Sequence, residues 1–193
     1  MKKLLLFIAV LLGSIATFAQ PRNEQQAKQI TADSFEKKPQ KETHVKAQTP
    51  ALKQMDFDLF CIKVPQKCKL LNENVYPEYD NMLCKTYTTP NEEFFFTYCI
   101  FDINKDFDLE QRLRGEAWEM ANIDIDEVGF FGVATGTDHP LLSTIADFPN
   151  FNIAIGIYPH YDKGKGIYVC LIDMNKIENA FLMTLMSSFR PVM

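Results

Sequence analysis

Residues 102–110, DINKDFDLE, hold four carboxylates and one asparagine in nine positions. An EF-hand calcium loop beginning at Asp102 would take oxygen ligands from Asp102, Asn104 and Asp106 at its first, third and fifth positions. Its sixth position must be glycine and its twelfth a bidentate glutamate. Those positions are Phe107 and Leu113. The sequence therefore excludes an EF-hand at this place.

The same stretch is typical of a strand that runs into a helix. Asp106 or Asp108 can cap that helix, because a carboxylate accepts hydrogen bonds from the free backbone N–H groups of the first turn. Asp108 and Gln111 have the spacing of a capping box. We therefore expect the carboxylates to anchor a helix start. A weak calcium site is the alternative, with Asp102, Asn104, Asp106 and Asp108 as its candidate ligands.

Two histidines in the body of the chain could take part in chemistry or recognition. His160 lies in the stretch YPHYDKG, and with Tyr158 and Tyr161 it could line an interaction surface at the end of a hairpin. The alternative is a hydrolase with an unrecognised site near His139 or His160, for example a Cys170 thiol with His160 as its base. The motifs GxSxG and HExxH and the phosphate loop are absent. We therefore assign no catalytic residue and expect no cofactor.

Five cysteines leave at least one unpaired within a monomer. Their spacing contains no CxxC, so it supports neither a zinc ribbon nor a thioredoxin-type motif. Cys84 and Cys99 flank an expected hairpin and face each other if its loop centres on Asn91 and Glu92, which brings a disulfide within reach. The alternative is that most of the cysteines are small buried residues on strands. The five are Cys61, Cys68, Cys84, Cys99 and Cys170.

The first 19 residues have the layout of a secretory signal peptide. Two lysines precede an apolar run from Leu4 to Leu12, and small residues lead to a cleavage site after Ala19. A membrane-spanning helix needs about 20 apolar residues, and Gly13 interrupts this run early. We expect an exported protein, periplasmic or secreted, with no membrane span after cleavage.

Residues 20–54 and 55–193 differ in composition and charge. Residues 20–54 have one aromatic residue and a net charge of +3, from seven Lys/Arg and four Asp/Glu. Such a segment buries too little apolar surface to offset the entropy of ordering, so we expect a disordered arm or tether. Residues 55–193 have a net charge of −10, from 11 Lys/Arg and 21 Asp/Glu, and the length of a single domain. This acidity argues against a nucleic-acid partner.

The domain is expected to be α+β, a largely antiparallel sheet covered by two main helices. Strand-like runs include residues 57–64, closed by Pro65, and two hairpins with turns near Pro90 and in DKGKG. Residues 123–140 are also expected to be strand-like. Apolar residues three or four apart predict one helix within DLEQRLRGEAWEMANI, and apolar residues four apart predict another within NKIENAFLMTLMSSF, where Asn175 and Glu178 fit a capping box.

This layout resembles the PsbP-like fold from residue 56 to residue 189. The resemblance lies in the opening strand FDLFCIKVP, the stretch EEFFFTYCIFDINKDFDLEQRL, the late hairpin of FNIAIGIY and GIYVCLI, and the closing SSF. It implies an αβα sandwich and a non-catalytic interaction or accessory module. We expect a binding domain with a protein or envelope component as its partner. A small-ligand carrier, which would need a large apolar cavity, is a further alternative.

Overall fold

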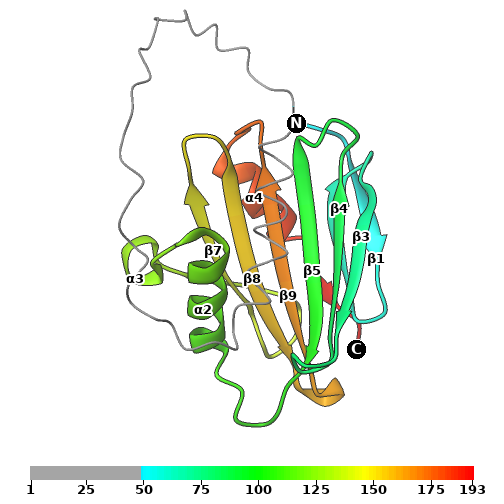
Figure 1. Cartoon of the computed structure of the whole chain (residues 1–193), viewed down its shortest axis with the longest axis vertical. Coiled ribbons are helices and arrows are strands. Elements are labelled where there is room, and N and C mark those ends of the chain that lie inside the picture. Colours follow the sequence, from blue (N-terminus) through cyan, green and yellow to red (C-terminus); the bar gives the residue numbers. More distant parts are fainter. Residues whose placement is uncertain (1–48) are drawn as a thin grey trace, which may run out of the picture. The chain divides into compact units, whose positions relative to one another are not determined.

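The computed structural model describes residues 49–193. The expected signal peptide, residues 1–19, and residues 20–48 of the expected arm lie outside the described residues. In the described part the chain is α+β, with antiparallel strands in two sheets and three α-helices (Figure 1). Among those helices, none has the length and apolar character that crossing a membrane requires.

Seven strands form the larger sheet, in the order β3-β4-β5-β9-β8-β7-β6, with antiparallel neighbours throughout. Both expected hairpins are confirmed, one between β4 and β5 and one between β8 and β9. The second hairpin turns through a short 3-10 helix, Tyr161–Lys163. The strands are β3 Lys69–Tyr76, β4 Met82–Thr88, β5 Phe94–Asp102, β6 Phe131–Val133, β7 Leu141–Asp147, β8 Asn152–His160 and β9 Lys165–Asp173.

A second sheet has three strands in the order β1-β2-β10. These are β1 Leu52–Asp56, β2 Phe60–Pro65 and β10 Arg190–Pro191. Strand β1 begins three residues before the expected domain boundary at residue 55. The expected strand over 57–64 starts only at Phe60, because the backbone turns at residues 57–59 and the Phe57 N–H donates to the Phe60 carbonyl at 2.8 Å.

Helix α2 (Leu109–Ala121) lies where the apolar spacing predicts it and buries Leu113 and Ala117. It ends at Asn122, which adopts the left-handed conformation common at helix ends. Residues 125–128 form a short helix, α3 (Ile125–Val128), where a strand was expected. This part of the expectation is wrong because Asp124 caps a helical turn by accepting a hydrogen bond from the Asp126 N–H at 2.9 Å.

Helix α4 (Asn179–Met186) is shorter than the apolar pattern indicates, and the capping box expected at Asn175 and Glu178 is not formed. The carboxylate of Asp173 instead accepts hydrogen bonds from the backbone N–H groups of Asn175 at 3.0 Å and Ile177 at 2.7 Å. These bonds hold the chain in a turn after β9, so the helix starts one turn later.

The two main helices pack on opposite faces of the larger sheet. Helix α2 contacts β7 and β8 on one face, and α4 contacts the same two strands on the other, beside the smaller sheet (Figure 1). At Gly156 of β8, an added Cβ would lie 2.5 Å from the methyl group of Met186 and 3.0 Å from the hydroxyl of Ser143, so a larger residue here would require these side chains to shift. The core under α4 also contains Phe60, Phe96 and Phe189, which are fully buried.

Candidate functional site

The acidic stretch between β5 and α2, residues 102–108, is called the acidic corner here. An ion pair and hydrogen bonds of its side chains stabilise it. Asp102 forms an ion pair with Lys165 and accepts a hydrogen bond from the side-chain amide of Asn81 at 2.7 Å. These two hydrogen bonds, the one from Lys165 first, lower the pKa of Asp102. Asn104 accepts a bond from the Asp106 N–H at 3.0 Å. Among the described residues, no group of three or more acidic, histidine or cysteine side chains is arranged to hold a metal ion.

Asp108 is the residue of this corner that caps helix α2. Its Oδ1 accepts a hydrogen bond from the Gln111 N–H at 2.9 Å, and its backbone is extended, as expected for an N-cap. The interpretation of the stretch as a strand that runs into a helix cap is therefore confirmed for Asp108.

Replacing Asp108 with alanine is expected to lower the free energy of unfolding by about 1 kcal/mol, because one backbone donor of the first helical turn loses its acceptor. Urea denaturation of the full chain measures this loss. The matched control is Asp106→Ala, two residues earlier in the same exposed loop, and it should change stability by less than about 0.5 kcal/mol. Equal losses in the two variants would mean that the cap does not stabilise α2.

The aromatic end of the β8–β9 hairpin does not present its three candidate residues together. Tyr158 and His160 are buried, whereas Tyr161 is exposed. The Tyr158 hydroxyl is 2.9 Å from the hydroxyl of Thr137, and His160 Nε2 is 2.9 Å from the carbonyl of Val192. Only Tyr161 of the three is accessible to a partner here.

Cys170 and His160, considered above as a thiol nucleophile and its base, do not lie close to each other. His160 is paired with Lys165 across the hairpin, and Cys170 with Ile155. The two residues therefore lie five positions apart along neighbouring strands, or about 17 Å. The ring of His139 contacts the ring of Tyr161, with centroids 5.0 Å apart. Of the two histidines considered for a hydrolase, His160 thus contacts a backbone carbonyl and His139 contacts an aromatic ring.

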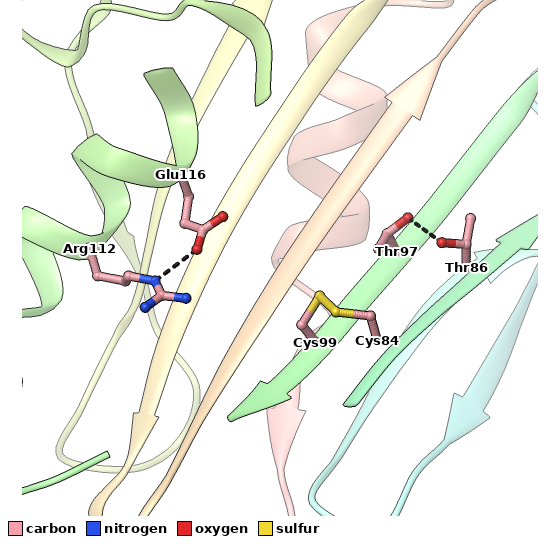
Figure 2. The surroundings of a disulfide bond; sticks show 6 residues. All are labelled: Cys84, Thr86, Thr97, Cys99, Arg112 and Glu116. Atoms are coloured by element: carbon pink, nitrogen blue, oxygen red, sulfur yellow. Dashed lines mark hydrogen bonds and ion pairs between the residues drawn. A yellow bond between two sulfur atoms is a disulfide. The ribbon is translucent and has the colours of Figure 1, made fainter. Parts of the chain in front are cut away.

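Cys84 and Cys99 form a disulfide across the β4–β5 hairpin (Figure 2). They occupy directly opposite positions in the strand register, as the loop centred on Asn91 and Glu92 predicts. Thr86 and Thr97 form the next pair on the same face, with their hydroxyls 3.0 Å apart. The alternative expectation also holds in part, because Cys68 and Cys170 are buried free thiols on or beside strands.

An ion pair on α2 lies near this disulfide (Figure 2). Arg112 donates through Nε to Glu116 at 2.7 Å and also lies 4.5 Å from the centroid of the Phe101 ring. Burial raises the pKa of Glu116 against the opposing effect of Arg112. The nearby Tyr168 hydroxyl is also buried, beside the thiol of Cys170.

Burial also makes two of the free thiols poor nucleophiles. It raises the pKa of the Cys170 thiol to about 12, and that of Cys68 to about 11 despite the opposing charge of Lys53. The thiolate is the reactive form of cysteine, so neither residue is reactive near neutral pH.

We expect alkylation of the native protein to modify Cys61 first, because it is partly exposed. Cys68 and Cys170 should react at a comparable rate only after unfolding in denaturant. Peptide mass spectrometry after brief treatment with iodoacetamide at pH 8 distinguishes the three sites. Rapid labelling of Cys170 in the native protein would contradict the burial of its thiol.

A groove with a mixed lining lies on the outer side of the smaller sheet. This groove has a volume of about 610 Å³ and is open to solvent. Alternation along β1 and β2 turns the inward residues, such as Ile62, into the core and the outward residues toward the groove. We call it the β1–β2–α4 groove; its lining residues are Leu52, Gln54, Cys61, Lys63, Met183, Thr184, Ser187, Ser188 and Arg190.

The groove combines apolar, hydroxyl and cationic groups. Leu52 lies on β1, and Met183, which is 37% exposed, lies on α4. Lys63 lies on β2 and Arg190 on β10, and none of the described lining residues is a carboxylate. These apolar, hydroxyl and cationic groups are suited to recognition of an anionic, partly apolar ligand.

The sequence pattern alone does not indicate this groove. Alternation in FCIKVP could have placed Cys61 and Lys63 on one outward face. No local signal joins that face to Arg190, which is paired with Cys61 although the two residues are far apart in the chain.

Comparisons with known proteins add little to this structural description. No protein-family model matches the sequence, and no curated protein matches it. Among solved structures, a mutant of the protein Mog1 is similar with a TM-score of 0.42 and 8% sequence identity, covering 72% of this chain and 95% of that one. A similarity at this level supports no conclusion about the function of the chain.

Proposed function

We propose that the protein is an exported, non-catalytic binding or accessory domain whose partner is a protein or another component of the cell envelope. The observation that carries this proposal is the β1–β2–α4 groove, which is open, partly apolar and cationic within an acidic domain. Exposed concave surfaces that mix apolar and charged side chains are suited to partner recognition.

Two features support export to the periplasm or the exterior. The first 19 residues have the three-part layout of a signal peptide. The chain also contains a disulfide between Cys84 and Cys99, and such bonds persist in oxidising compartments. Cell fractionation followed by intact-mass measurement tests this. The proposal expects a chain that begins at Gln20 outside the cytoplasm, and full-length protein in the cytoplasm or membrane would overturn it.

Membership of the PsbP-like fold is part of the same proposal. It is supported by the order of elements, in which a hairpin leads into α2 and a late hairpin leads into α4, and by a sheet that lies between these two helices. The resemblance implies an accessory module rather than an enzyme.

Capture from an envelope extract tests the proposed function. The bait is the mature chain from Gln20 to Met193, compared with its Met183→Glu variant, which places a negative charge on the exposed side of α4 in the groove. The matched control is Lys105→Gln, a substitution of an exposed residue in the acidic corner. The proposal expects a partner that the wild type and the control retain and the groove variant loses. A partner retained equally by all three, or none, would overturn it.

A further inference from the structure

The charge of the β1–β2–α4 groove is opposite to that of the domain around it. Residues 55–193 have a net charge of −10, yet the described residues that line the groove include Lys63 and Arg190 and no carboxylate. A local cationic surface on an acidic domain attracts anionic partners and repels cationic ones.

We propose that the groove binds an extended acidic segment of a partner protein. Its carboxylates would interact with Lys63 and Arg190, and an apolar side chain beside them would pack between Leu52 and Met183. This inference rests on the proposed binding function and specifies the chemistry of the partner.

Lys63 is positioned for such a contact without being neutralised. Its backbone N–H donates to the hydroxyl of Ser188 at 2.8 Å, which fixes this part of β2 against the end of α4. Its side chain is in no ion pair with the described residues, whereas several other lysines, such as Lys85 and Lys165, are paired with carboxylates. A ligand carboxylate can therefore reach its ammonium group without displacing another acid.

Arg190 is held in a fixed orientation by the end of α4. One terminal nitrogen, Nη1, donates to the carbonyl of Ser187 at 2.9 Å, near the negative end of the helix dipole. Among the described residues no hydrogen bond involves its other terminal nitrogen, Nη2, or its Nε. Those two nitrogens form the side of the guanidinium that can bind a carboxylate in a bidentate manner.

The apolar and acidic residues around Lys63 and Arg190 limit the orientation in which a partner can bind. Leu52, on β1, and Met183, on α4, provide apolar contact area in the groove. Asp56 is at the far end of β1 on the same outward face, and its carboxylate accepts a hydrogen bond from Gln54 at 2.7 Å. Because Asp56 repels carboxylates, we expect the acidic residues of the partner to favour the part of the groove near Lys63.

Fluorescence anisotropy with short labelled peptides tests the inference on the full mature chain. The probes are a peptide in which leucine and glutamate alternate, the same peptide with glutamine in place of glutamate, and an oligonucleotide. We expect the glutamate peptide to bind about tenfold more tightly than the glutamine peptide at low salt, an advantage that declines as ionic strength rises. Equal binding of the two peptides, or tighter binding of the oligonucleotide, would overturn the inference.

Variants separate this inference from the proposed function. Lys63→Gln should remove most of the preference for glutamate, and Lys105→Gln should leave it unchanged. Since Arg190 also donates to the carbonyls of Ser187 and Phe189, just after α4, Lys63 is the better site for substitution. If Met183→Glu abolishes capture of an envelope partner but the peptides show no charge preference, the groove binds a partner of another chemistry and only the inference fails. If neither assay depends on the groove, the proposed function fails as well.

Discussion

Replacing Phe60 with alanine is expected to lower the free energy of unfolding by about 3–5 kcal/mol, because it leaves a cavity in the core. Phe60 is fully buried between the two sheets. Its ring centroid is 5.2 Å from that of Phe189, stacked, and 5.1 Å from that of Tyr98, edge-on. The loss should therefore combine apolar burial with these ring contacts.

Urea denaturation of the full chain, followed by tryptophan fluorescence and circular dichroism, measures this effect. The matched control is Phe130→Ala, since Phe130 is 40% exposed and should cost less than about 1 kcal/mol. Similar costs for the two substitutions would contradict the packing of the smaller sheet on the larger one. Strands β1 and β2 of the smaller sheet also line the groove, so the same measurement bears on the site.

Removing the disulfide is expected to cost about 3 kcal/mol. Cys84 and Cys99 are separated by 15 residues in sequence, and closing a loop of that length restricts the unfolded chain. The double variant Cys84→Ala/Cys99→Ala should therefore unfold at a lower urea concentration than the wild type. Treatment of the wild type with a reducing agent should shift it in the same direction.

Cys61→Ala serves as the control, because Cys61 is a partly exposed free thiol. The free energy of unfolding of this variant should differ from that of the wild type by less than about 1 kcal/mol. It should still fall when the disulfide is reduced. The double variant, in contrast, should be insensitive to the reducing agent. A wild-type protein whose stability is unaffected by reduction would show that the bond does not contribute as expected.

The elements that depend on local sequence could be predicted well. The spacing of Leu113 and Ala117 predicts α2, and turn residues predict the β4–β5 hairpin together with its register, which brings Cys84 opposite Cys99. Asp108 as the cap of α2 also follows from local spacing. In each case the interacting residues lie within about a turn or a hairpin of one another, so the signal is contained in a short window.

The features that depend on contacts between distant segments could not be predicted. The burial of His160 comes from the end of the chain, where the Val192 carbonyl lies against its ring. Helix α4 starts later than the sequence predicts, because the carboxylate of Asp173 at the end of β9 accepts hydrogen bonds from the backbone that follows it. The groove itself needs β10 to pair with β2, which no periodicity in either segment indicates.

A charge-exchange titration tests the central claim, that Lys63 makes this groove select carboxylates, most directly. Lys63→Glu should bind the alternating leucine–glutamate peptide more weakly than the wild type does, by about tenfold, and should bind a leucine–lysine peptide more tightly by a similar factor. We expect this reversal because the substitution changes the charge that selects the peptide. Unchanged affinity for both peptides after the substitution would contradict it.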